Sequence, residues 1–243
     1  DSATRDGTSA RVAALFDHGV MGGALPADIP AGTDPTTAPP QIVRGTPPPH
    51  IRALLDHAAE QFLTRGYEGP SLLDIGSAAR VGRGTLYRHF ASKAGLFAAV
   101  LHDLAEQVAA AAEVPALPDP AAPPEVVERG IEAFIIAALA NLGSVRSLAL
   151  HRVAIAAAPR DPTLARAIHD RVRAPWLAPL SAWLDSVLGV AAPNWAARAL
   201  LVLALQGNRL IVAGRSLPAT ETTDHARRTA RLFLGGLACT LAG

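Results

Sequence analysis

Apolar residues recur at three- and four-residue spacing from Ile51 onward, which is the period of an amphipathic helix. The positions on this face are Ile51, Leu54, Leu55, Ala58, Phe62 and Leu63. Gly66 interrupts the pattern, because glycine adopts a left-handed conformation beyond a helix end at low cost. Tyr67 can then fold back onto the last turn, so the pattern predicts a first helix that ends at Gly66.

Two short helices are predicted next. Ser71 precedes Asp74 by three residues, a spacing similar to that of a capping box, in which the hydroxyl accepts a hydrogen bond from the first helical turn. The second helix is expected at residues 72–79 and the third at residues 82–90. A tight break at residues 80–81 separates them.

A long fourth helix and two proline-rich segments divide the rest of the chain. Ser92 is expected to cap a helix at about residues 93–113. Five prolines in VPALPDPAAPP, residues 114–124, require a loop. Eight more prolines lie between residues 22 and 49, so residues 1–49 are predicted to be a flexible leader.

Beyond the loop, the pattern predicts only helices. Their expected ranges are residues 125–142, 147–157, 163–188, 194–213 and 222–242. Pro175 and Pro179 are expected to kink or split the third of these. Residues 199–213 are apolar around most of the helix circumference, which indicates burial in a core and an interface.

Composition supports an all-α fold. Half of the 243 residues are hydrophobic but only 5% are aromatic, and the apolar residues are mostly Ala, Leu and Val. The net charge of +1 alone argues neither for nor against a nucleic-acid partner. Between residues 50 and 93, however, six basic residues face four acidic ones, so the positive charge lies at the short helices.

The chain has features of a cytoplasmic protein. Cys239 is the only cysteine, which excludes an intrachain disulfide and a cysteine-based zinc site. No charge-free apolar stretch reaches the roughly 18 residues that suggest a membrane span. Acidic residues at positions 1, 6 and 17 are atypical of a signal peptide.

The strongest motif is an ordered set of features. It runs through IRALLDHAAEQFLTRGY and then PSLLDIGSAARVGRGTLYRHFASKAGLFAAVL. Residues 51–101 closely resemble the DNA-binding domain of the TetR/AcrR family of transcriptional repressors. The resemblance implies a three-helix helix-turn-helix domain at residues 50–95. It also implies a larger helical domain at residues 96–243 that binds a ligand and dimerises.

The third predicted helix supplies the candidate base contacts. In a helix-turn-helix the second helix enters the major groove with its N-terminal residues at the base edges. Arg83 can donate two hydrogen bonds to guanine, and Thr85 can bond a base or contact a thymine methyl. Gly84 allows close backbone approach. Arg88 is expected to face water or pair with an acid.

Phosphate contacts are expected from four other side chains: Ser71, Tyr87, His89 and Lys93. Ser71 and Lys93 lie at helix starts, where the helix dipole favours an anion. Tyr87 can alternatively pack, and His89 can simply be solvated. A small domain core is predicted from Phe62, Ile75, Val81, Leu86 and Phe90.

The sequence departs from the family pattern near the motif. Arg80 stands where the turn usually has glycine, and a left-handed arginine costs roughly 1 kcal/mol. Gly82 and Pro70 replace a common serine and threonine, which removes two hydroxyls that can contact phosphate. Ala94 and Gly95 replace the usual acid at the start of the fourth helix, which weakens that start.

Ligand and subunit contacts are expected in the second half. An apolar cavity is predicted to be lined by Phe134, Leu139, His151, Trp176, Leu180, Trp183 and Leu205, although an apolar residue at this spacing more often belongs to an ordinary core. His151, Gln206 or Arg209 would orient an apolar or aromatic effector. Residues 199–213 and 228–242 are expected to form a homodimer interface, which predicts a palindromic DNA operator.

Other functional classes find less support. The chain has no GxSxG, phosphate-binding glycine loop, HExxH or Cys–His pair, so no enzyme, metal or cofactor is expected. A helical ligand-binding or partner-binding protein that has lost operator binding remains an alternative, because of the departures at residues 70, 80 and 82. A transcriptional activator is also compatible with the sequence.

Overall fold

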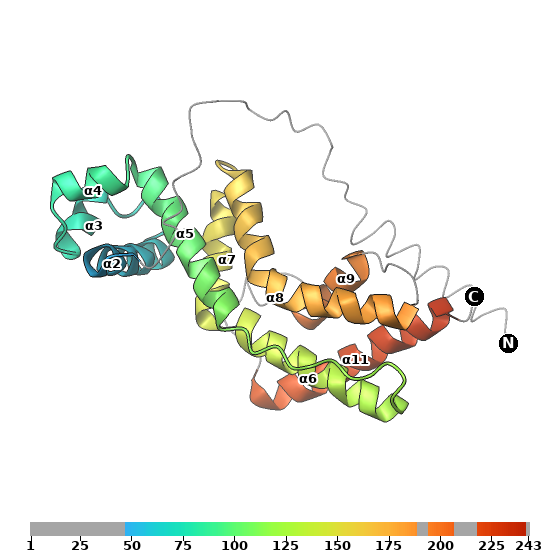
Figure 1. Cartoon of the computed structure of the whole chain (residues 1–243). Helices are drawn as coiled ribbons and strands as arrows, with labels where there is room; N and C mark the ends of the chain where they lie inside the picture. The colour runs from blue at the N-terminus through green and yellow to red at the C-terminus, as the bar shows by residue number, and fades with distance from the viewer. Residues whose placement is uncertain (1–46, 189–193, 207–217, 242–243) are drawn as a thin grey trace. The chain divides into compact units, whose positions relative to one another are not determined.

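The computed structural model describes residues 47–188, 194–206 and 218–241, and these ranges contain helices, turns and loops but no strand. The described helices are α2 (Pro49–Arg65), α3 (Leu72–Ala78), α4 (Arg83–His89), α5 (Lys93–Ala110), α6 (Pro124–Leu142), α7 (Val145–Ala157), α8 (Pro162–Leu188), α9 (Asn194–Ala204) and α11 (Ala219–Leu241) (Figure 1). The predicted all-α fold is confirmed. Residues 1–46 of the predicted leader lie outside the described residues.

The first helix begins at Pro49 and ends as predicted. Pro49 occupies the first helical position, where the missing amide hydrogen costs nothing, so this residue belongs to α2 and not to the leader. Gly66 has φ +69°, and its amide donates to the carbonyl of Phe62 at 3.0 Å. Tyr67 stacks on Phe62 and meets Phe97 edge-on, so the chain after the glycine does fold back onto the domain core.

Helix α5 connects the small N-terminal domain to the rest of the protein. It packs against α2 on one side and against α7 and α8 on the other. Arg52 of α2 holds both carboxylate oxygens of Asp103 on α5, one of them at 2.8 Å. This two-bond contact fixes the crossing of the two helices.

The proline-rich loop before α6 is held on the helices around it. The indole nitrogen of Trp183 donates to the carbonyl of Pro118 at 2.7 Å. Pro118 also packs on Gly130 of α6, where a Cβ would lie 2.6 Å from the proline ring. The predicted loop is therefore confirmed, and it is a packed connection.

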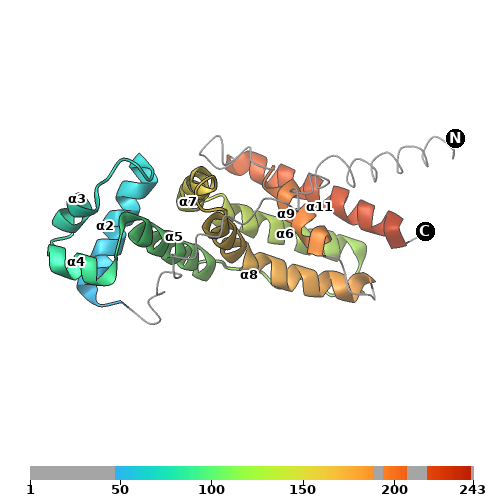
Figure 2. The same cartoon turned by 90° about the horizontal axis from the view of Figure 1, so that it is seen from above.

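The C-terminal helices form the larger domain. Helix α11 lies along α6, and α9 contacts α6, α8 and α11 (Figures 1 and 2). Ion pairs of Arg227 with Glu132 and of Arg231 with Glu128 flank the contact of α6 with α11. Helix α8 remains one helix through Pro175 and Pro179, and its ribbon bends along its length in Figure 1, as expected for internal prolines.

One predicted helix is wrong in length. The range 194–213 was expected to be a single helix, but α9 ends at Ala204. Gln206 takes φ +54°, and its amide turns back to the carbonyl of Leu203 at 3.2 Å. Residue 207 is a glycine, and the helix ends inside the apolar run. Residues 207–213 of the predicted interface lie outside the described residues.

No single helix of the described segments is both long and apolar enough to cross a membrane. The pair α6 and α7 passes the same length and composition test only when taken together, across a bend of 66°.

Candidate nucleic-acid interface

The turn between α3 and α4 is set by backbone hydrogen bonds. The amide of Val81 donates to the carbonyl of Gly76 at 2.8 Å, and that of Arg80 to the carbonyl of Ser77 at 3.1 Å. This pair of bonds is a Schellman motif, which needs a left-handed residue just beyond the helix. Arg80 takes that position with φ +54°, as expected for an arginine in place of the usual glycine.

The two helices of the motif approach each other closely at Gly76. A Cβ there would lie 2.9 Å from Cδ2 of Leu86 on α4. Ile75, Val81 and Leu86 are buried against this contact, and the predicted core residues Phe62 and Phe90 are buried as well. Packing of this kind holds the short α4, which its own few hydrogen bonds would not stabilise in isolation.

The outer face of α4 carries the predicted DNA-contacting side chains. Arg83, Gly84, Tyr87 and His89 are exposed, and Thr85 is half-buried. Tyr87 is 42% exposed, with the Arg83 guanidinium 5.6 Å from its ring centre. A Cβ at Gly84 would meet nothing within 4 Å, so the surface there is open. His89 meets the ring of His50 edge-on at 6.4 Å.

Two serines cap the helices beside α4. Ser71 Oγ accepts a hydrogen bond from the amide of Asp74 at 3.0 Å, and Ser92 Oγ accepts one from Gly95 at 3.1 Å. Both predicted caps are confirmed. Each hydroxyl hydrogen stays available, and both serines are exposed.

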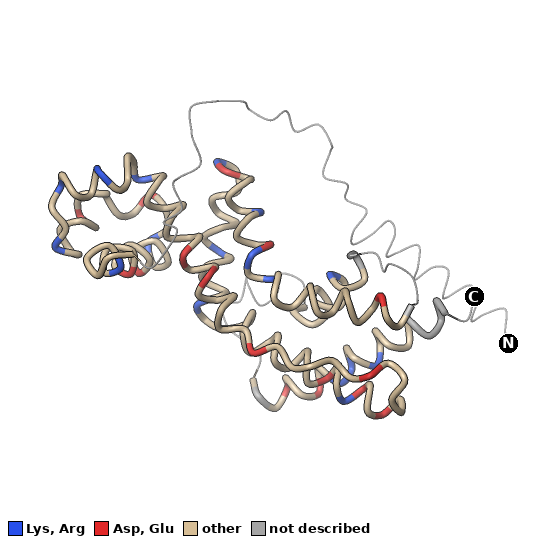
Figure 3. Tube along the Cα trace, viewed as in Figure 1, with Lys and Arg blue, Asp and Glu red and all other residues tan. Residues whose placement is uncertain are grey.

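The charge around α4 has one sign. Residues 75–102 contain no acidic residue but include Arg80, Arg83, Arg88 and Lys93. Figure 3 shows these basic positions along α4 and at both of its ends. Among the described residues none of the four forms an ion pair. This surface therefore attracts anions such as DNA phosphates.

Lys93 has contacts that the sequence did not predict. Its ammonium donates to the carbonyl of Glu68 at 3.2 Å and lies 4.7 Å from the ring centre of Tyr67. Arg160, in the connection between α7 and α8, pairs with the carboxylate of Glu68 and lies 5.2 Å from the same ring. Lys93, Tyr67, Glu68 and Arg160, here called the Tyr67 cluster, link the DNA-binding domain to the regulatory domain.

The predicted ligand-site residues lie mainly in the core of the regulatory domain. Phe134, Trp176 and Leu180 are fully buried, and Phe134 meets Trp176 edge-on at 5.5 Å. The Trp176 indole donates to Asn141 Oδ1 at 3.1 Å. Leu139, Trp183 and Leu205 are also buried. Arg209 lies outside the described residues.

His151 belongs to a polar cluster instead of an apolar lining. Nη1 of Arg173 lies 2.9 Å from Nε2 of His151 and 2.7 Å from Nδ1 of His169. A guanidinium only donates, so both imidazole nitrogens accept, and Nδ1 of His151 donates to the carbonyl of Ser147 at 2.8 Å. Burial and the charge of Arg173 lower the pKa of each histidine to about 4, and burial lowers the pKa of Arg173 to about 10.

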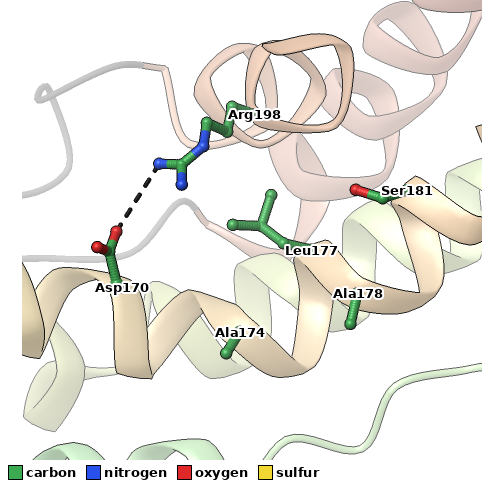
Figure 4. Close-up of a pocket in the computed structure, with 6 residues that line it drawn as sticks. All are labelled: Asp170, Ala174, Leu177, Ala178, Ser181 and Arg198. Atoms are coloured by element: carbon green, nitrogen blue, oxygen red, sulfur yellow. Dashed lines mark ion pairs between the residues drawn. The ribbon is translucent and has the colours of Figure 1, made fainter. Parts of the chain in front are cut away.

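A groove between α8 and α9 lies next to this cluster. It has a volume of about 390 Å³, opens to solvent and is lined by Asp170, Ala174, Leu177, Ala178, Ser181 and Arg198. Figure 4 shows Leu177 pointing from α8 towards α9, with the ion pair of Asp170 and Arg198, at 3.8 Å, joining the two helices. None of the predicted ligand residues that the structure describes lines this groove.

Sequence reasoning missed Arg160 and Arg173. Arg160 contacts a residue 92 positions earlier, and no local pattern reports such a contact. Arg173 shares a helix face with His169 four residues before it, which is a detectable spacing. The second histidine that Arg173 contacts, His151, lies on another helix. The spacing of His169 and Arg173 alone therefore did not indicate the cluster.

Comparisons with known proteins agree with these observations. The model for bacterial regulatory proteins of the tetR family matches residues 54–100. The model for the C-terminal domain of AefR-like transcriptional repressors matches residues 129–236. The two matches together cover most of the chain. No curated protein matches the sequence.

Solved structures with the same fold include several regulators. A protein described as a TetR-family transcriptional regulator, from Mesorhizobium loti MAFF303099, is 25% identical over 76% of this chain and 95% of its own, with a TM-score of 0.59. The flavonoid-responsive regulator FrrA gives the same values. A TetR regulator from Agrobacterium tumefaciens, at 18% identity, covers 77% of this chain and 94% of its own with a TM-score of 0.61, which shows the fold.

Together, the helix-turn-helix geometry and the two family matches show that this chain belongs to the TetR family of bacterial transcriptional regulators and is a DNA-binding regulator.

Proposed function

We propose that the protein is a ligand-responsive repressor that binds a palindromic operator as a homodimer and leaves it when a small apolar or aromatic molecule binds. The observation that carries this proposal is the outer face of α4. That face combines exposed polar side chains, a close-packed inner face and an acid-free stretch with four basic residues.

The proposed DNA-contacting residues divide into base contacts and phosphate contacts according to their position relative to α4. Arg83, Gly84 and Thr85 occupy its first turn, which in a helix-turn-helix approaches the base edges. Arg83 is the candidate for a bidentate contact to guanine. Ser71 and His89, nearer the edges of the motif, are placed to contact phosphates.

Tyr87 and Lys93 complete the proposed phosphate contacts. Tyr87 is exposed beside Arg83, so its hydroxyl can reach the DNA backbone. Lys93 is half-buried against Tyr67, and its ammonium, which donates one of three N–H groups to the carbonyl of Glu68, can donate another to a phosphate. Operator binding is thereby linked to the Tyr67 cluster.

A homodimer is supported by the exposed face of α11. Leu232 is 64% exposed, and a Cβ at Gly235 or Gly236 would meet nothing within 4 Å. Small residues beside an exposed leucine allow a second helix to approach closely. A two-fold dimer would place two copies of α4 in successive major grooves, roughly 34–36 Å apart.

The effector proposal has two supports. One structural neighbour, at 25% identity, is described as flavonoid-responsive, which favours an aromatic effector here. The regulatory domain has aromatic side chains in its core, with Trp176 against Phe134. The effector must bind more tightly to a conformation that no longer fits the operator, because equal binding to both states would shift nothing.

A gel-shift experiment tests operator binding. The purified protein is titrated onto its own upstream intergenic DNA with excess nonspecific competitor, beside the variant Thr85→Ala plus Lys93→Ala and the control Arg166→Ala, at an exposed position of α8. We expect the double variant to bind at least tenfold more weakly and Arg166→Ala to change little.

The result also separates the alternatives. If no specific complex forms, a random-site selection follows, and failure to enrich any sequence would refute the repressor and favour a protein that has lost operator binding. A reporter gene behind the operator distinguishes repression from activation.

A further inference from the structure

Arg173 is partly buried but has no carboxylate partner. It lies half-buried in α8, and no carboxylate of the described chain lies within 4 Å of it. The nearby Asp170 pairs with Arg198 instead. Leaving a guanidinium in such a place without an anion is unfavourable.

The guanidinium of Arg173 is nevertheless held in one orientation. Nη1 donates to His151 and His169, and the low pKa of both rings keeps them neutral acceptors at pH 7. Nε and Nη2 have no partner among the described residues. The buried side-chain atoms without a partner in the described part of the chain are Arg52 Nε and Ser147 Oγ, and neither atom of Arg173 is among them.

The Nε–Nη2 edge of the neighbouring Arg171 shows what such an edge can bind. Nε and Nη2 of Arg171 hold the two carboxylate oxygens of Glu106, with Nε at 2.7 Å. This two-bond geometry is the strongest way for arginine to bind a carboxylate. Arg171 therefore has its anion, whereas Arg173 presents an equivalent edge that has no partner among the residues that the structure describes.

We propose that the Nε–Nη2 edge of Arg173 is the anchor for the carboxylate of a small organic acid, and that the effector of this regulator is such an acid. The inference rests on the proposed ligand response. It also specifies the chemistry of the effector, since an apolar molecule without a negative charge would leave Arg173 unpaired. Ala174 and Leu177 line the groove between α8 and α9, whose described lining does not include Arg173, and they lie one and four residues after Arg173 on α8.

Thermal unfolding of the full-length protein tests the anchor. The protein is titrated with benzoate, 3-phenylpropionate and octanoate, and with the neutral amide of each acid. We expect at least one acid to raise Tm more than its amide does, because a ligand that binds the native state stabilises it. In Arg173→Gln the affinity for that acid should fall roughly ten- to a hundredfold, as expected when a charged hydrogen-bonded pair is lost.

Two variants control for a structural effect. Arg171→Gln removes a neighbouring guanidinium whose edge is already filled, so it should keep the acid affinity. Arg173→Lys keeps the charge without the two-bond edge and should bind with intermediate affinity. Far-ultraviolet circular dichroism confirms that each variant is folded.

The anchor is refuted if no acid stabilises the protein, if acids and amides stabilise it equally, or if the acid affinity survives in Arg173→Gln. A gel shift with the same ligands separates this result from the proposed function. Operator release by an amide would keep the ligand response and refute the carboxylate anchor. Binding of an acid that depends on Arg173 but releases no operator would keep the anchor and refute the ligand response.

Discussion

The DNA-binding and regulatory domains use arginine in opposite ways. On and beside α4, Arg80, Arg83 and Arg88 are exposed in an acid-free stretch and form no ion pair among the described residues. In the regulatory domain, Arg171 and Arg231 pair with glutamates of neighbouring helices. Unpaired charge on the first domain remains available to DNA, whereas several arginines of the second domain join neighbouring helices through ion pairs.

Arg173 does not follow the pattern of the paired arginines in the regulatory domain. It is less exposed than the free arginines of α4, but it also lacks the carboxylate that its neighbour Arg171 has. Two neutral histidines stand in the place of a counterion. In the regulatory domain, the candidate for anion binding is thus the single side chain of Arg173. In the DNA-binding domain, it is the whole basic face of α4.

The largest predicted effect concerns the buried imidazole of His151, which contacts Arg173. His151 is 5% exposed, and burial followed by the charge of Arg173 lowers its pKa to about 4. An unfolded histidine has a pKa near 6.5, so between pH 6.5 and 4 the unfolded chain binds a proton that the native protein does not. The free energy of unfolding should therefore fall as the pH decreases through this window, by up to about 3 kcal/mol.

Urea unfolding at several pH values measures this dependence. His151→Gln should remove only the part of the fall that His151 contributes, because the pKa of His169 is also lowered to about 4. His57→Gln, at an exposed position of α2, should leave the fall unchanged. An identical pH profile in wild type and His151→Gln would show that His151 is not the group responsible.

The two domains also differ in how much of them the sequence predicts. Around α4, local patterns were sufficient: the caps at Ser71 and Ser92 and the positive φ at Arg80 depend on residues a few positions apart. A turn of this kind is determined by its own backbone bonds and by one close helix contact at Gly76.

In the regulatory domain, periodicity predicted the helices but not their contacts. Trp176, one of the apolar residues expected at a cavity, is fully buried, and helical spacing alone does not distinguish a core position from a pocket lining. The end of α9 at Ala204 was missed for a similar reason, since a continuous apolar run carries no stop signal. Contacts such as that of Arg160 with Glu68 arise only in the folded chain.

A smaller effect is expected at the turn of the DNA-binding domain. Arg80 has φ +54°, which is costly for any residue with a Cβ. Arg80→Gly should therefore raise the free energy of unfolding by about 1 kcal/mol, less the entropy that glycine adds to the unfolded chain. Arg80→Ala is the matched control, because it removes the same charge and keeps the Cβ. An equal gain in both variants would mean that charge, and not the backbone, limits stability here.

The smallest predicted effect lies between the domains, in the Tyr67 cluster. Arg160 and Glu68 are 58% and 70% exposed, and an exposed ion pair contributes about 0.2–1 kcal/mol. A double-mutant cycle of Arg160→Ala and Glu68→Gln should give a coupling energy in this range, and 1 M salt should reduce it. Arg166→Ala, on an exposed position of α8 without an ion pair, is the control for loss of charge.

A larger coupling energy, or one insensitive to salt, would contradict this view of the contact. The expected value is nevertheless functionally relevant, because allosteric coupling energies are typically only about 1–3 kcal/mol. Lys93 shares Tyr67 and Glu68 with Arg160, so moving the α7–α8 connection would change the surroundings of a proposed phosphate contact. A weak, exposed contact can be exchanged at low cost, as a domain that alternates between bound and released states requires.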